Sequence, residues 1–175
     1  MRKPNHNLRG AFTLVELLVV IAIMGLLVSI VLPSLGRAKE LARRVKCRTN
    51  LHAVGVGLRM YLDENKDIMP IAAAMPSLKL TEEPSIAEVL RPFLEQPDCL
   101  RCPSDTETNY WRSEGASYEY RTTYGGKQVS KLFLTQRIGE QNTPVMYDYE
   151  PFHGPPGEAG SAQYLFADGH VGNLE

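Results

Sequence analysis

The sequence predicts an α+β fold in which one long N-terminal helix packs on a small antiparallel β-sheet head. Three observations predict it. An apolar run of 21 residues, 12–32, is followed by a segment whose helical periodicity continues to about residue 64. Short extended segments follow after Ser117, and two of them are separated by Asp168-Gly169, a dipeptide favoured in tight hairpin turns.

The apolar run contains a single residue that is ionised at neutral pH, Glu16. At about 1.5 Å per residue the run is long enough to cross a bilayer core of about 30 Å. A carboxylate at the centre of such a helix costs on the order of 2.5–3.5 kcal/mol, and less near its end. No Lys, Arg or His lies between Phe12 and Ser34, so the partner of Glu16 must be the basic leader, a lipid head group or another molecule. We therefore interpret Glu16 as an assembly signal.

The string from Gly10 to Glu16, between a short basic leader and the apolar run, resembles the processing site of type IV prepilins and type II secretion pseudopilins. The resemblance implies that a prepilin peptidase removes residues 1–11 by cutting between Ala11 and Phe12 and then N-methylates Phe12. It also implies that Glu16, the fifth residue of the mature chain, guides subunits into a filament. These families usually have Gly directly before the cut, so cleavage after Gly10 stays open. The alternative is a plain signal anchor in which Glu16 snorkels to the interface.

The chain is predicted to have four parts. They are the leader 1–11, a hydrophobic transmembrane or filament-core helix 12–35, an amphipathic helix 36–66 that continues into the head, and an exported globular head 67–175 with a C-terminal β-hairpin. Pro33 lies where many pilins carry a helix-kinking proline, and it removes one backbone hydrogen bond. Apolar or small residues recur at three- and four-residue steps from Leu35 to Leu62, which predicts a stripe that packs on the head. Gly55 and Gly57 each weaken a helix by up to about 1 kcal/mol relative to Ala, and we expect them to mark close packing.

Within the head, five prolines interrupt residues 67–97, which are predicted to form a connector with one short helix at 85–94. The predicted strands lie after this connector. They are 118–124, 145–149, 164–167 and 170–174, the last two forming the hairpin.

Charge gives conflicting indications of orientation. Removing the leader takes away three of the 19 Lys and Arg residues and leaves 16 against 20 acidic residues, a mildly acidic chain with no sign of nucleic-acid binding. The basic residues that follow the apolar run would, by the positive-inside rule, lie in the cytoplasm. The prepilin resemblance implies the opposite, with a cytoplasmic leader, a single pass through the inner membrane and a periplasmic head. We expect this second orientation.

The chain has three cysteines, Cys47 and the C-x-x-C pair Cys99 and Cys102. In an oxidising compartment we expect one disulfide that uses Cys99 or Cys102, with Cys47 as the preferred partner because the closed loop of about 50 residues is worth about 3–4 kcal/mol in the loop-entropy model. A zinc site is an alternative. Its further ligands would come from Cys47, His52, His153 and His170. Redox catalysis is a weaker alternative, because the flanking sequence lacks a thioredoxin-like context.

We expect no cofactor. Calcium is an alternative that the pseudopilin resemblance implies, since major pseudopilins bind it through oxygen ligands in a C-terminal loop. The candidates are Asp148, Glu150, Asp168 and Asn173. We favour the interpretation that Asp168 only supports its turn and that the other side chains are solvated.

Several strings in the distal chain resemble a large group of poorly characterised bacterial pilin-like proteins with a C-terminal Asp-Gly motif. These strings are Cys47-Arg48-Thr49-Asn50-Leu51, Cys102-Pro103-Ser104-Asp105, Ser117-Tyr118 and Phe166-Ala167-Asp168-Gly169-His170-Val171. Part of that group has a His followed nine residues later by Asp-Gly, whereas fourteen residues separate His153 from Asp168 here. This resemblance implies no catalytic chemistry.

Together these observations predict a structural subunit of a type IV pilus-like or type II secretion pseudopilus filament. We expect it not to be an enzyme, because no nucleophile-elbow, phosphate-loop or Ser/His/Asp signature is present. The expected partners are copies of itself, other pilin-like subunits, the prepilin peptidase and an inner-membrane assembly platform. The alternative is a membrane-tethered exported module that binds an ion, a glycan or a surface partner and uses the same processing signal.

Overall fold

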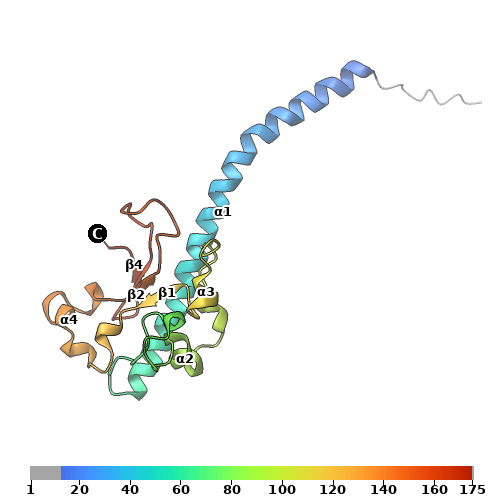
Figure 1. Ribbon diagram of the computed structural model, residues 1–175. Coiled ribbons are helices and arrows are strands. Elements are labelled where there is room, and N and C mark those ends of the chain that lie inside the picture. Colours follow the sequence, from blue (N-terminus) through green and yellow to red (C-terminus); the bar gives the residue numbers. More distant parts are fainter. Residues whose placement is uncertain (1–12, 175) are drawn as a thin grey trace, which may run out of the picture. The chain divides into compact units, whose positions relative to one another are not determined.

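The computed structural model describes residues 13–174 (Figure 1). The predicted processing residues Gly10, Ala11 and Phe12 lie outside the described residues. The chain divides between Lys39 and Glu40 into two compact units, and helix α1, Leu14–Glu64, contributes to both. The predicted α+β arrangement of a long N-terminal helix and a small antiparallel sheet is confirmed.

In the first unit, α1 exposes its apolar side chains. Every Leu, Ile, Val and Met between Leu14 and Leu35 is between 41% and 80% exposed. By length and composition, α1 could cross a membrane. Pro33 lies inside the helix and does not end it.

The second unit contains a four-stranded antiparallel sheet in the order β1-β2-β3-β4. The strands are β1 Tyr118–Tyr120, β2 Pro144–Asp148, β3 Tyr164–Phe166 and β4 Val171–Gly172. Leu165 pairs with Val171 across the predicted hairpin, whose turn places Gly169 at a φ of 92°, in the left-handed region that favours glycine. The β1 strand is shorter than predicted, because residues 122–124 form a turn of 3-10 helix instead of continuing the strand.

Three short α-helices lie in the second unit. They are α2 Ile86–Leu90, α3 Tyr110–Ser113 and α4 Phe133–Ile138. A capping box begins α2, where the side chains of Ser85 and Glu88 each bind the other's backbone N–H. The predicted helix 85–94 is α-helical only as far as Leu90, because a 3-10 turn containing Pro92 follows.

One face of α1 forms the centre of the head core. Its buried residues are Cys47, Asn50, Leu51, Val54, Gly55, Gly57, Leu58 and Leu62. This face packs with fully buried side chains of the sheet, including Tyr118, Met146 and Leu165. The predicted stripe therefore begins later than expected, since Leu41 and Val45 are 61% and 58% exposed.

Gly55 and Gly57 lie where α1 meets the rest of the head most closely. A Cβ atom at Gly55 would lie 2.6 Å from Leu165 Cδ1 and 3.2 Å from the carbonyl oxygen of Gly169. A Cβ atom at Gly57 would lie 2.6 Å from Leu94 Cδ2. The expectation that these glycines mark close packing is confirmed.

We predict that Gly55→Ala destabilises the head. Leu165 is fully buried and the Gly169 carbonyl is backbone, so neither can move away freely, and overpacking of this kind costs about 1–3 kcal/mol. This exceeds the gain of up to about 1 kcal/mol from better helix propensity. Thermal unfolding of the full chain in detergent, followed by circular dichroism, measures the effect. Gly36→Ala is the matched control, because no neighbouring atom lies within 4 Å of its added Cβ; equal melting of both variants would contradict the packing account.

Candidate functional site

The N-terminus of α1 is held by a reciprocal cap between Thr13 and Glu16. The carboxylate oxygen Oε2 of Glu16 accepts hydrogen bonds from the Thr13 backbone N–H at 2.9 Å and from its hydroxyl at 2.7 Å. The Glu16 N–H in turn donates to Thr13 Oγ1 at 3.2 Å. The T-x-x-E spacing is itself a capping signature, which the sequence interpretation overlooked. No ion pair within residues 13–174 involves Glu16, so its charge has no cationic partner in the described chain.

A second candidate site lies inside the head, where Cys47, Cys102, Asp148 and His153 come together. Their ligand-type atoms all lie within 4.8 Å of one another, and all four residues are buried. Cys47 comes from α1, Cys102 follows the 3-10 helix Pro97–Leu100, Asp148 ends β2 and His153 lies in the loop after it. The cluster therefore joins segments that are up to 106 residues apart in the sequence.

The distances within this cluster are short. The Sγ atom of Cys47 lies 3.5 Å from Asp148 Oδ1, and the Sγ atom of Cys102 lies 3.5 Å from His153 Nε2. The same imidazole nitrogen lies 3.7 Å from Asp148 Oδ2, which also accepts a hydrogen bond from the Gln163 N–H at 2.8 Å. The side chains of both Asp148 and His153 are fully shielded from solvent.

Burial and mutual contact shift the pKa values of these groups in opposite directions. Burial raises the pKa of Asp148 to about 7. The hydrogen bond between the two thiols, helped by His153, lowers the pKa of Cys102 to about 6, whereas it raises that of Cys47. Burial opposes the charged form of His153, but contacts with Cys102, Asp148 and Glu40 outweigh it and raise its pKa.

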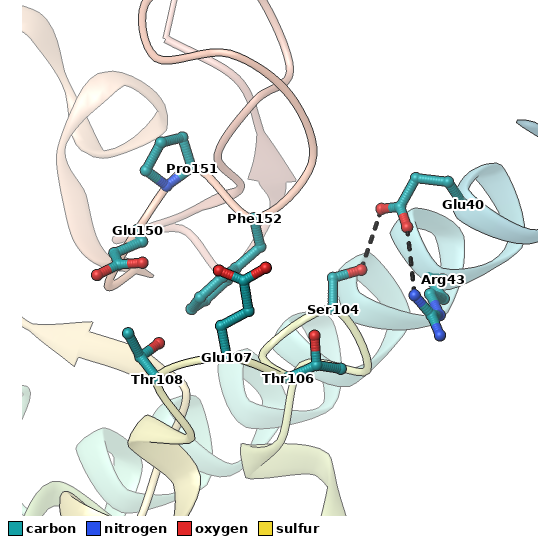
Figure 2. Close-up of a pocket in the computed structure, with 9 residues that line it drawn as sticks. All are labelled: Glu40, Arg43, Ser104, Thr106, Glu107, Thr108, Glu150, Pro151 and Phe152. Carbon is teal, nitrogen blue, oxygen red and sulfur yellow. Dashed lines mark hydrogen bonds and ion pairs between the residues drawn. The ribbon is translucent and has the colours of Figure 1, made fainter.

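A surface pocket of about 330 Å³ opens beside the cluster (Figure 2). Glu40 lines it and forms an ion pair with Arg43 at 3.7 Å. Its Oε1 atom accepts a hydrogen bond from the Ser104 hydroxyl at 3.0 Å and lies 3.3 Å from His153 Nδ1. Glu107 and Glu150 also line the pocket. Glu40 thus connects an acidic, solvent-facing pocket with the buried imidazole.

The structure separates the three cysteines. Cys102 lies beside Cys47, whereas Cys99 does not belong to the cluster, and all three thiols are free. The disulfide stays a prediction, and Cys102 is the cysteine of the C-x-x-C pair that is placed to form it. Of the histidines named for the zinc alternative, His153 joins the cluster. His52 is exposed, and His170 instead contacts Asp168 at 2.7 Å and stacks on Phe166.

The calcium candidates have separate surroundings. Asp148 lies among thiols and imidazole, and Glu150 accepts a hydrogen bond from the Tyr110 hydroxyl at 2.8 Å. Asp168 supports its own turn by accepting from the His170 N–H at 3.1 Å, and Asn173 accepts from the Gln163 amide at 3.3 Å. Calcium binding stays untested.

Asp105 is a buried carboxylate that the sequence interpretation did not single out. It accepts hydrogen bonds from the Ser117 hydroxyl at 2.8 Å and from the backbone N–H groups of Trp111 and Tyr110 at 3.1 and 3.3 Å. It thereby joins two of the strings quoted above, Cys102-Pro103-Ser104-Asp105 and Ser117-Tyr118, and holds the start of α3. The presence of both strings in the sequence was the only sequence signal for this contact.

Comparison with known proteins identifies relatives of the chain. The family model described as the prokaryotic N-terminal methylation motif matches residues 6–32. The type II secretion system core protein G of Klebsiella michiganensis is 33% identical over 105 residues, which cover 60% of this chain and 70% of that protein. The core protein G of Pectobacterium carotovorum subsp. carotovorum is 38% identical over 104 residues, 59% of this chain and 58% of that protein. No solved structure matches the chain significantly.

We predict that Asp105→Ala destabilises the head by about 1–3 kcal/mol or more, because it leaves several buried donors without an acceptor. Ser117→Ala removes one of these hydrogen bonds and should cost less, about 0.5–1.5 kcal/mol. Urea unfolding of the two variants beside the wild type measures the difference. If Asp105→Ala is no less stable than Ser117→Ala, the carboxylate does not organise this segment.

Proposed function

Given that this chain belongs to the family of the type II secretion system core protein G, whose members are pseudopilins, we propose that it is anchored in the inner membrane and then enters a type II secretion pseudopilus as a structural subunit. The observation that carries this proposal is the methylation motif, which matches residues 6–32 and so includes the exposed apolar start of α1. The membrane-tethered binding module is not favoured by the comparisons.

We propose that the precursor spans the inner membrane once, with residues 1–11 in the cytoplasm and the head in the periplasm. In this orientation the prepilin peptidase removes the leader between Ala11 and Phe12 and methylates the new amine. Supporting this, the exposed apolar surface of α1 begins at Leu14, close behind the proposed cut. The assembly platform then transfers the subunit from the membrane to the filament, where other pilin-like subunits cover the same apolar surface.

Glu16 supplies the directional contact of this assembly. Thr13 satisfies hydrogen bonds of its carboxylate but leaves its charge uncompensated. A neighbouring subunit that is displaced along the filament axis brings its Phe12 amine beside Glu16. Pairing the two charges removes much of the cost of holding a carboxylate in apolar surroundings, which amounts to several kcal/mol in a dry site.

The head contributes surface and shape to the filament instead of catalysis. The ligand-type side chains of its buried cluster suit binding, and the buried carboxylate of Asp105 is engaged in structural hydrogen bonds. We therefore propose that the protein is not an enzyme.

We predict that the assembled protein begins at Phe12 with a methylated amine. Mass spectrometry of the N-terminal peptide from native membranes and from sheared filaments measures this directly. A terminus at Ala11 would show cleavage after Gly10, which places Glu16 sixth. An intact leader in assembled filaments would contradict processing altogether.

We predict that Glu16→Gln and Glu16→Leu both enter the membrane with a folded head but reduce filament incorporation about tenfold or more, a loss of at least about 1.4 kcal/mol. Glu16→Gln keeps an oxygen that can accept from Thr13 and loses only the charge, so it separates charge pairing from helix capping. The yield of sheared filaments relative to total membrane protein is the measurement.

Thr13→Ala is the matched control, since it removes the cap at a cost of about 1 kcal/mol and keeps the carboxylate. It should assemble nearly as well as the wild type. Normal assembly of Glu16→Gln would show that the charge does not matter, and poor assembly of Thr13→Ala beside it would show that the cap does.

A further inference from the structure

We propose that Cys47, Cys102, Asp148 and His153 form a structural zinc site in the head. This site is separate from the processing and assembly signals at the start of α1, so it can be tested independently of the filament role.

The spacing of the four side chains fits a tetrahedral ion. With zinc–sulfur bonds of about 2.3 Å and zinc–nitrogen or zinc–oxygen bonds of about 2.0–2.2 Å, neighbouring donor atoms in a tetrahedron lie about 3.3–3.8 Å apart. The distances from Cys47 Sγ to Asp148 Oδ1 and from Cys102 Sγ to His153 Nε2 are both 3.5 Å. These two distances match edges of a zinc tetrahedron, and ligand-type atoms of all four residues lie within 4.8 Å of one another.

The chemical types of the four donor side chains favour zinc over other metals. Two thiols and an imidazole suit zinc, whereas calcium and magnesium prefer shells made of oxygen. Four protein ligands complete the coordination, and Cys47 and Cys102 are 0% exposed. A closed, buried set of four ligands is typical of structural zinc sites, since catalytic sites keep one position for water or substrate.

Surrounding groups orient these ligands as they do in zinc proteins. His153 offers Nε2 to the cluster, while its Nδ1 lies 3.3 Å from Glu40 Oε1. This carboxylate–imidazole contact fixes the tautomer of a zinc-binding histidine. On Asp148, the Gln163 N–H occupies Oδ2 and leaves Oδ1 for the metal.

A disulfide between Cys47 and Cys102 would explain only half of the cluster. It would leave the Oδ1 atom of the fully buried Asp148 facing a sulfur atom that has no proton to donate, with His153 and the Gln163 N–H as the remaining partners of the carboxylate. Zinc uses all four groups. It also ties α1 to the C-x-x-C segment and to the end of β2, so metal binding and folding of the head are coupled.

The test measures zinc in the full chain, purified in detergent from membranes without chelators and under anaerobic conditions. We expect about one zinc per chain by elemental analysis. Cobalt(II) offered to the chelator-treated protein should give the visible bands of a tetrahedral site together with thiolate-to-cobalt charge transfer. Removing the metal should lower the melting temperature of the head, and added zinc should restore it.

Matched variants locate the ligands. Cys47→Ser, Cys102→Ser, Asp148→Asn and His153→Gln should each bind less than about a tenth of the zinc, whereas Cys99→Ser, His52→Gln and Asp168→Asn keep it. Glu40→Gln, which alters a positioning residue, should bind zinc about 10–100-fold more weakly.

Three results would overturn the proposal. The first is a wild-type chain that stays zinc-free when zinc is supplied to the reduced protein. The second is a Cys47–Cys102 disulfide in the protein as it comes from membranes. The third is equal zinc loss in the control variants. Because chelation of the wild type needs no substitution, the test holds even if a ligand variant fails to fold. If the first result is found and the wild type still enters filaments, this proposal fails and the pseudopilin role stands.

Discussion

Close packing of the Cys47–Leu62 face of α1 in the head is the interaction on which the rest of the structure depends. The same helix exposes its apolar side chains toward its N-terminus and buries one face where the head covers it. The two glycines let the backbone approach the β3–β4 hairpin and the segment after α2. Since the sheet has four short strands, this helix face supplies much of the core that the sheet alone could not bury.

Hydrogen bonds of buried polar side chains fix the segments of the head that lie outside the sheet. Asp105 gathers the residues between Cys102 and Ser117, and the hydroxyl of Tyr120 fixes the Pro70 carbonyl at 2.8 Å. The cysteine–aspartate–histidine cluster joins α1 to both the C-x-x-C segment and the strand end. In each case a buried polar group has a hydrogen-bond partner, near in the sequence for Asp105 and 50 or more residues away for Tyr120 and the cluster, and these contacts help a head with little regular structure to adopt one fold.

Features that depend on neighbouring residues could be predicted from the sequence. The helix through Glu64 followed from periodicity, and the hairpin followed from the Asp168-Gly169 turn flanked by apolar residues. The start of the buried stripe could not be predicted, because Leu41 and Val45 fit the same period as Leu51 and differ only in what lies opposite them. The cluster of cysteine, aspartate and histidine side chains was even harder to predict. Nothing local distinguishes His153 from His170, or tells that Asp148 lies beside Cys47, 101 residues earlier.

The most direct test of the account asks what covers the exposed apolar surface of α1. A photo-crosslinking amino acid at Leu26, which is 63% exposed in the isolated chain, should capture another copy of this protein or another pilin-like subunit in cells that carry the secretion machinery. The same position should yield no such product when the assembly platform is absent. Equal crosslinking in both kinds of cell, or crosslinks to lipid alone when the machinery is present, would contradict the claim that this helix surface forms the core of a filament.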